Sequence, residues 1–397
     1  MLRTRSRWLA GVALVAVLVA TAVTTASATS KVKKPSGAPW IVYNITDENA
    51  SGGAPAEYTV GMKAAAAYVN NELGGMKGRP IQIDTCNPNV DPAATLACAN
   101  TAVSANPILI SGYSLLFGQN GQSVIEKAGI PMMMFPAQDQ QLNSPLNFPL
   151  GGGIATAWPI MAKYLANVKK ITRIATITYD LASVRAIIHN FLDPLQAKNV
   201  AINQTYFPVG TADFTSQAVA ATSFNPDVIY VGAAGTDAVR IYKALQQAGW
   251  SASKIWNTGT ALDKDLFFDQ AGSAVDGSVY TTYFDSFDNL ANPEVKLFRS
   301  KMEKYQHVDG ESQNFQWGFS AIMTMLSASK QIKSLSPASL GSFLTNASNF
   351  PIFMGQNFIP KKHVDPSRIG IRAPLIRLVR WKNGQLVNMT KGFISFK

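Results

Sequence analysis

The sequence predicts an α/β fold made of two doubly wound, parallel-sheet lobes. Three observations lead to this prediction: short apolar runs alternate with helical patterns, the alternation occurs as two series, and a glycine-rich stretch at 151–153 separates them. Strand–helix–strand units at this spacing form parallel sheets with helical crossovers. The strands are nearly continuous apolar runs, which is typical of strands covered on both faces. We therefore expect two lobes rather than one very wide sheet.

The first 28 residues are predicted to be a secretory signal peptide. Three arginines precede the apolar run WLAGVALVAVLVATAV, and ASA at 26–28 supplies the small residues of a cleavage site. The run is short for a membrane span, and an uncleaved anchor remains the alternative. No cysteine precedes Cys86. We therefore expect an exported protein of the periplasm or cell envelope, or a secreted one, and not a lipoprotein.

The first series holds four strands and three helices. They are expected at 40–45, 81–84, 107–113 and 130–136 for the strands, and at 58–73, 91–105 and 118–128 for the helices. Apolar residues of the first helix recur at steps of three and four, and Gly74 suits the left-handed residue that closes it. Pro80 cannot donate to a strand ladder, so the strand that follows it is expected at a sheet edge.

The same apolar patterns predict the strands and helices of the second series and of the C-terminal part. Strands are expected at 173–179, 201–207, 227–232, 254–259 and 277–284, and helices at 156–167, 183–197, 213–222 and 236–248. The pattern then becomes helical at 292–305 and 313–332. The segment APLIRLVRWKNGQLVNM predicts a hairpin, because Asn383-Gly384 is a favoured two-residue turn.

Cys86 and Cys98 are the only cysteines. In an exported protein an even pair is most simply a disulfide, and this one would join the end of the edge strand to the following helix. Two cysteines without neighbouring histidines form neither a zinc site nor a CxxC redox pair. We therefore expect the bond to hold an edge strand that has a neighbour on one side only.

Composition and motifs exclude several functions. The net charge of +11 falls to +8 without the three signal arginines, and the basic residues are dispersed, which argues against nucleic-acid binding. The three histidines, His189, His307 and His363, have no partners at metal-ligand spacing and are expected on the surface. The chain lacks the GxSxG, HExxH, Walker A and GxGxxG motifs. We expect no enzyme, no cofactor, no metal site and a monomer.

The order of elements resembles the type I periplasmic binding proteins, specifically the leucine/isoleucine/valine-binding family of ABC importers. The similarity lies in EYTVGMKAAAAYVNNELGGMKGRPIQIDTCN, in GQSVIEKAGIPMMMFPA and in DFTSQAVAATSFNPDVIYVGAAGTDAVRIYKALQQAG. It implies two Rossmann-like lobes joined by a three-crossing hinge, with lobe 1 at 38–156 plus 286–340 and lobe 2 at 157–285 plus 341–397. It also implies a small-molecule ligand and a membrane permease of an ABC transporter as partners.

The resemblance places ligand contacts in the loops that follow successive strands. By position these are Ser114, Leu115 and Leu116; Ala137, Gln138 and Asp139; Asp180, Ala182 and Ser183; Ala233, Ala234 and Thr236; and Thr258, Gly259 and Thr260. Tyr283 and Phe284, at the end of the strand expected at 277–284 and near a lobe crossing, are further candidates that would wall the site with apolar area; ordinary sheet core beside a hinge is the alternative. The first two loops hold a carboxylate in amino-acid binders through backbone N–H groups and small hydroxyls.

The second lobe departs from the family pattern. Aromatic residues are replaced by small ones, and the acid that pairs with a ligand ammonium is replaced by Thr258, Gly259 and Thr260, with Asp263 the nearest carboxylate. Burial of an ammonium without a counter-charge is costly. We therefore expect a carboxylate-bearing, fairly apolar ligand rather than a branched-chain amino acid. A sensor of the same fold and, with less support, a secreted α/β hydrolase are the alternatives.

Overall fold

A computed structural model describes residues 33–50, 54–114, 117–136, 139–208, 210–259 and 262–395. The predicted signal peptide lies outside these residues. In the ranges that are described, no helix combines the length and apolarity needed to cross a membrane.

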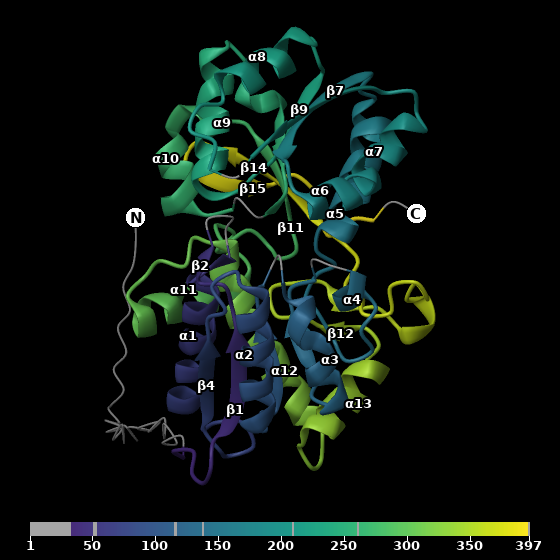
Figure 1. The fold of residues 1–397 in the computed structure, drawn as a ribbon. Helices are drawn as coiled ribbons and strands as arrows, with labels where there is room; N and C mark the ends of the chain where they lie inside the picture. Colours follow the sequence, from purple (N-terminus) through teal and green to yellow (C-terminus); the bar gives the residue numbers. More distant parts are fainter. Residues whose placement is uncertain are drawn as a thin grey trace, which may run out of the picture. The chain divides into compact units, whose positions relative to one another are not determined.

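The first sheet contains the four strands of the first series in the order β4-β1-β5-β6, all parallel. The strands are β1 (Trp40–Ile45), β4 (Ile81–Cys86), β5 (Leu109–Gly112) and β6 (Met132–Met134). The helices between them are α1 (Glu57–Glu72), α2 (Pro92–Ser104) and α3 (Gln119–Lys127). Figure 1 shows α1 and α2 beside β1 and β4. All seven predicted elements are present.

The second sheet has the order β15-β14-β11-β10-β9-β7-β8, and only β14 and β15 run antiparallel to their neighbours. Its strands are β7 (Arg173–Tyr179), β8 (Ala201–Phe207), β9 (Val228–Gly232), β10 (Ile255–Asn257), β11 (Val279–Thr282), β14 (Arg377–Lys382) and β15 (Gln385–Asn388). Its helices are α5 (Ile154–Tyr164), α6 (Ala182–Ile187), α7 (His189–Gln196), α8 (Thr215–Ser223) and α9 (Gly235–Gln247). The predicted α/β fold with two parallel-strand sheets is confirmed.

Three passages of the chain join the two sheets. The first lies between β6 and α5, and the second follows β11 and leads into α11 (Pro293–Gln306), α12 (Gln313–Gln331) and α13 (Pro337–Asn346). The third leads from α13 to β14. Because α11 and α12 pack against α1, these helices belong with the first sheet. We call the first sheet with α1–α3, α4 (Asp139–Leu142) and α11–α13 the first lobe, and the second sheet with its helices the second lobe. The residue boundaries expected for the lobes remain a prediction.

Two glycines allow α1 and α12 to approach closely. A Cβ added to Gly61 would lie 2.3 Å from the carbonyl oxygen of Phe315, and one added to Gly318 would lie 1.9 Å from that of Tyr58. No side chain fits such spacings, so the backbones touch directly. This contact fixes α12, which carries part of the site described below.

The predicted edge strand and disulfide are both confirmed. β4 has β1 as its neighbour on one side and lies at the end of the sheet order. Gly74, which follows α1, has φ 75°, as expected of a left-handed helix end. Cys86, the last residue of β4, is bonded to Cys98 of α2. The bond therefore ties the edge strand to the helix that covers it.

The predicted C-terminal hairpin is also present. β14 and β15 pair with Lys382 opposite Gln385, which leaves Asn383 and Gly384 as the two turn residues. Their φ angles are 53° and 75°, and positive values at both positions define the turn type that matches the twist of a hairpin.

The helix predicted at 183–197 is wrong as a single element, because it divides into α6 and α7 at Ile188. Pro194 in α7 and Pro159 in α5 each lack the N–H that continues a helix. The carbonyl of Ala155, four residues before Pro159, instead accepts a hydrogen bond from Arg368 (3.1 Å). Arg368 also donates to the side chain of Asn190 (3.2 Å), so the third passage is fastened to α5 and α7.

Several short elements escaped prediction. They are β2 (Asn49–Ala50), β3 (Ala54–Pro55), α4 (Asp139–Leu142), α10 (Asp269–Ala271), α13, β12 (Phe350–Pro351) and β13 (Asn357–Phe358). Most are too short for a periodic pattern to be visible.

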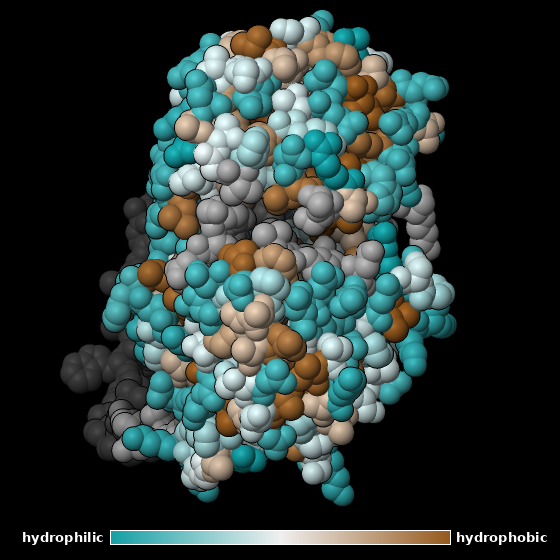
Figure 2. Space-filling view, in the orientation of Figure 1, coloured by the Kyte–Doolittle hydropathy of each residue, from teal (hydrophilic) through white to brown (hydrophobic). Residues whose placement is uncertain are grey.

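The face drawn in Figure 2 is mixed, with hydrophilic side chains among scattered hydrophobic ones. His189, His307 and His363 are exposed, as expected.

Candidate functional site

A small cavity lies where the two lobes meet. Its described lining comes from both lobes and consists of Tyr113, Phe135, Ile154, Thr258, Gly259, Tyr283, Gln313, Asn314 and Trp317. The space inside it that is open to the centre of a water-sized sphere is about 10 Å³. Four of the residues directly follow the carboxyl ends of β5, β6, β10 and β11. This is the edge of a parallel sheet at which α/β proteins bind ligands.

Four aromatic side chains form one wall of the cavity. The ring of Phe135 lies 4.5 Å from that of Tyr113 and 5.2 Å from that of Trp317, with an edge-to-face angle of 76° for the second pair. The ring of Tyr283 lies 5.4 Å from that of Trp317. All four residues are buried. Such a wall offers apolar area and aromatic edges and faces to a flat or apolar ligand.

Two buried polar atoms of the cavity residues lack a hydrogen-bond partner among the described residues. They are the hydroxyl of Tyr113 and Oε1 of Gln313. The pKa of Tyr113 is raised by burial, so this hydroxyl stays protonated and is able to donate. Buried polar groups are nearly always paired in folded proteins, and an unpaired one inside a cavity indicates a place for a ligand or a water molecule.

The lobes also contact each other through residues 262–264 and 311–313, which we call the interlobe bridge. The N–H of Lys264 donates to the carbonyl of Glu311 (3.0 Å), and the N–H of Gln313 donates to that of Leu262 (2.9 Å). Asp263 and Ser312 face each other between these bonds as an antiparallel pair. This contact brings the loop after β10 against the start of α12, at the side of the cavity.

A buried carboxyl group lies near the interlobe bridge but does not line the cavity. Burial, with a smaller contribution from Asp263 and Asp265, raises the pKa of Glu57 to about 7. Its Oε2 is buried without a hydrogen-bond partner in the described part of the chain. Asp263 itself caps the following helical turn by accepting from the N–H of Leu266 (2.6 Å). Neither carboxylate is among the described residues that line the cavity.

The cavity contains three of the residues predicted for the site: Thr258, Gly259 and Tyr283. Ser114 is buried beside it, and its hydroxyl donates to Oδ2 of Asp47 (2.7 Å). In this arrangement the Ser114 proton is already used. A ligand contact by this side chain remains a prediction.

The other predicted residues are dispersed or not described. Asp180 forms an exposed ion pair with Arg185, Thr236 is exposed in α9, and Ala233 and Ala234 are buried before α9. Phe284 is buried against Trp317. Asp139 begins α4, and Ala182 and Ser183 begin α6, with no description of their side chains. Leu115, Leu116, Ala137, Gln138 and Thr260 lie outside the described residues.

Six cavity residues were not predicted from the sequence: Tyr113, Phe135, Ile154, Gln313, Asn314 and Trp317. Tyr113 and Phe135 lie near the ends of predicted strands, one and two positions before the loops that were considered. For Gln313 and Asn314 the sequence carries a weaker signal than for Tyr113 and Phe135. Gln313 and Asn314 are polar residues at the start of a helix whose middle is largely apolar, and the sequence does not show that this helix end reaches the cavity.

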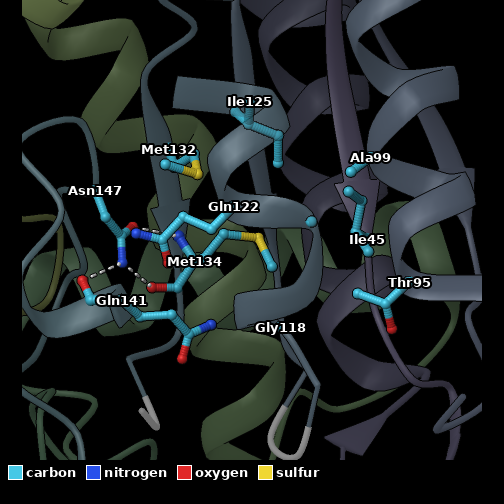
Figure 3. A pocket seen from close by; sticks show the side chains of 11 residues that line it. Ile45, Thr95, Ala99, Gly118, Gln122, Ile125, Met132, Met134, Gln141 and Asn147 are labelled. Carbon is cyan, nitrogen blue, oxygen red and sulfur yellow. Dashed lines mark hydrogen bonds between the residues drawn. The ribbon is translucent and has the colours of Figure 1, made fainter. Parts of the chain in front are cut away.

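A second cavity lies inside the first lobe, among β1, β6, α2 and α3 (Figure 3). Its polar lining serves the fold. Asn147 accepts from the N–H of Met134 (3.0 Å) and donates to its carbonyl (3.3 Å), so its side chain continues the edge of β6 as a further strand would. Gln122 donates to Glu126 (2.8 Å) and to the carbonyl of Gln140 (2.7 Å). Because these hydrogen bonds hold the first lobe together and the cavity lies within that lobe, it is not our candidate site.

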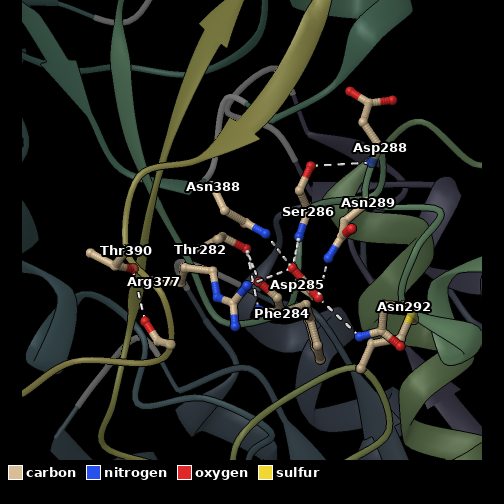
Figure 4. A network of polar contacts seen from close by, with 12 residues as sticks. Thr282, Phe284, Asp285, Ser286, Asp288, Asn289, Asn292, Arg377, Asn388 and Thr390 are labelled. Carbon is tan, nitrogen blue, oxygen red and sulfur yellow. Dashed lines mark hydrogen bonds and ion pairs between the residues drawn. The ribbon is translucent and has the colours of Figure 1, made fainter.

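The second passage is held by a buried carboxylate, Asp285 (Figure 4). Its two oxygens accept five hydrogen bonds, from Arg377 (2.7 Å), Asn388 (2.7 Å), the N–H of Ser286 (2.9 Å), Asn289 (2.8 Å) and Asn292 (2.9 Å). The donors come from β14, β15 and the segment between β11 and α11. Asp285 therefore connects the second passage with β14 and β15, the two strands that follow the third passage.

Comparisons with known proteins agree with this architecture. A family model described as "Periplasmic binding protein" matches residues 44–385. Structural comparison finds a leucine-binding protein from Thermotoga maritima (17% identity, 90% of this chain and 99% of that chain, TM-score 0.72). It also finds a solute-binding protein from R. palustris in complex with benzoate (16%, 91% and 98%, TM-score 0.73).

A fatty acid ABC transporter substrate-binding protein from Thermomonospora curvata is similar as well (15%, 92% and 95%, TM-score 0.75). No curated protein sequence matches the chain. Identities at this level establish the fold, whereas the family model extends over most of the chain and describes binding proteins. The expectation of a binding protein rather than an enzyme is therefore confirmed. The chain belongs to the periplasmic binding protein family and has its type I fold.

Proposed function

We propose that this protein is the extracytoplasmic substrate-binding protein of an ABC importer, and that its lobes close around a small, largely apolar organic acid. The observation that carries the proposal is the cavity between the lobes, which has four aromatic side chains and no charged side chain among its described lining residues. Ligand sites of this kind are mostly apolar, with a few placed polar groups. A membrane permease is the partner that such a protein serves.

The lining argues against a standard amino acid. An α-ammonium group needs a carboxylate or several acceptors when it is buried. The two nearby carboxyl groups, those of Asp263 and Glu57, lie outside the described lining, and Asp263 also caps a helical turn. One protein of similar fold is a solute-binding protein in complex with benzoate, and another is a fatty acid ABC transporter substrate-binding protein. Both support an apolar acid as the ligand here.

The carboxylate of such a ligand would lie toward the loops after β5 and β6. The hydroxyl of Tyr113, which follows β5 and has no partner among the described residues, is suited to donate to it. The Ser114 hydroxyl already donates to Asp47. We therefore assign the contact to the Tyr113 hydroxyl and to backbone N–H groups, which are oriented donors for an anion.

The proposal is tested by thermal denaturation with single compounds. Benzoate, cyclohexanecarboxylate, octanoate and 4-methylpentanoate form one set, and leucine, isoleucine and valine form the other. A ligand at 100 times its Kd stabilises the folded state by about 2.7 kcal/mol, so a bound acid raises the melting temperature. We expect a rise for at least one of the acids and none for the amino acids.

Two tryptophan variants locate the effect. Trp317→Leu removes part of the cavity wall and should abolish the ligand-induced rise, whereas Trp250→Leu, at the end of α9 and outside the described cavity lining, should retain it. A rise with leucine and none with 4-methylpentanoate, its deaminated analogue, would contradict the proposed ligand class.

A further inference from the structure

We infer that the ligand carries, besides its acid group, a neutral hydrogen-bond donor that is recognised by Oε1 of Gln313. The ligand class is then a hydroxylated or amino-substituted aromatic acid, or an alicyclic equivalent. This inference rests on the proposed function and adds a second polar group to it, at the start of α12.

The position of Gln313 is fixed by contacts with the second lobe. The residue is 3% exposed. Its Nε2 donates to the carbonyl of Gly259 (2.8 Å), and its backbone N–H donates to the carbonyl of Leu262 (2.9 Å). The amide can take only one orientation, because a flip would place Oε1 against the carbonyl oxygen of Gly259. Oε1 is therefore the acceptor that remains.

Gly259 makes this arrangement possible. A Cβ at this position would lie 2.6 Å from Nε2 of Gln313 and 2.6 Å from the carbonyl oxygen of Thr281. Only a residue without a side chain allows the amide of Gln313 to reach this carbonyl. The described part of the loop after β10 thus positions the amide through the Gly259 carbonyl and supplies no carboxylate.

Oε1 of Gln313 has no hydrogen-bond partner among the described residues, although it is buried and belongs to a cavity residue. A buried acceptor without a donor costs free energy, and a ligand donor removes that cost. A binding site with such an acceptor discriminates strongly against an analogue that lacks the donor, because the site's own group is then left unpaired.

The donor is neutral rather than an ammonium group. The described lining contains no carboxylate, and a single amide oxygen does not compensate for the desolvation of a full positive charge. The edge-to-face rings of Phe135 and Trp317 and the ring of Tyr113 suit a flat apolar frame between the two polar ends. A phenolic hydroxyl or an aromatic amine meets both requirements.

Calorimetry on the wild-type protein provides the first test. The probes are benzoate, the three monohydroxybenzoates, the three aminobenzoates and the three methoxybenzoates. We expect at least one hydroxybenzoate or aminobenzoate to bind roughly tenfold more tightly than benzoate, a difference of about 1.4 kcal/mol. The matching methoxybenzoate, which has lost the donor, should bind no more tightly than benzoate.

Gln313→Met provides the second test, because methionine keeps the length of the side chain without the amide. This variant also loses the bond to Gly259, which affects all ligands, so the informative quantity is the ratio of the Kd values for benzoate and the best hydroxybenzoate. We expect the ratio to fall from roughly ten to about one. Gln331→Met, at an exposed residue at the other end of α12 and outside the described cavity lining, is the control and should keep the ratio.

The outcomes separate the two proposals. If benzoate binds as tightly as every hydroxybenzoate and aminobenzoate, or if Gln313→Met keeps the preference, the role of Gln313 is wrong and the apolar-acid site stands. If none of these acids nor any of the other apolar acids binds, while leucine does, both the ligand class and the role of Gln313 are wrong.

Discussion

Asp285→Ala should reduce the free energy of unfolding more than any other single removal of a charge that we consider. The Asp285 side chain is 8% exposed and that of its partner Arg377 is 11% exposed, and their atoms lie 2.7 Å apart. Removal of one partner of a buried ion pair leaves the other charge without compensation, which costs about 3–5 kcal/mol. The side chains of Asn289, Asn292 and Asn388 also lose their acceptor.

Urea denaturation monitored by tryptophan fluorescence measures this loss, with Asp180→Ala as the control. Asp180 also pairs with an arginine at 2.7 Å, but the side chains are 42% and 51% exposed. Exposed pairs contribute about 0.2–1 kcal/mol. We therefore expect a shift in the unfolding midpoint for Asp285→Ala that is several times larger than that for Asp180→Ala.

A double variant tests the reasoning itself. If the cost comes from the uncompensated Arg377, then Asp285→Ala with Arg377→Met should be less destabilised than the sum of the single variants, with a coupling of about 1–3 kcal/mol. Equal midpoints for Asp285→Ala and Asp180→Ala, or strict additivity in the double variant, would refute it.

Three further predictions concern other parts of the fold. Removing the disulfide with Cys86→Ala and Cys98→Ala should lower the free energy of unfolding by roughly 3 kcal/mol, the value for so short a loop. Thiols that react with iodoacetamide in the native, unreduced protein would disprove the bond. Burial raises the pKa of Glu57 to about 7. The folded state therefore binds more protons than the unfolded state between about pH 4.5 and 7. As a result, the contribution of Glu57 to stability falls as pH rises through this range. Melting temperatures at pH 5 and 7.5 should therefore differ less in Glu57→Gln than in the wild type, and an unchanged difference would contradict this assignment. Gly318→Ala places a Cβ 1.9 Å from the carbonyl oxygen of Tyr58 and should destabilise the protein by about 2 kcal/mol or more in urea denaturation, whereas Gly392→Ala, in open space, should change it by less than about 0.5 kcal/mol.

Local sequence patterns determined most of the secondary structure. The strands at 40–45, 173–179 and 201–207 have the predicted bounds, because a short segment rich in β-branched and aromatic residues is a local signal for a strand. The turn at Asn383-Gly384 and the left-handed Gly74 were also predictable, since each depends on the conformational freedom of one or two residues. The disulfide followed from the number of cysteines and the export signal.

The composition of the cavity was decided by the tertiary structure. Tyr113, Thr258 and Gln313 belong to segments 55 to 200 positions apart in the sequence, and no local pattern specifies that they meet. Gln313 reaches the cavity because Gly61 and Gly318 allow α12 to pack directly on α1, and because Gly259 leaves space for its amide. Likewise, Asp285 and Arg377 pair only because β14 joins β11 in the second sheet. Periodicity indicates which face of an element is buried, but the neighbour that each buried side chain contacts depends on the packing of the whole chain.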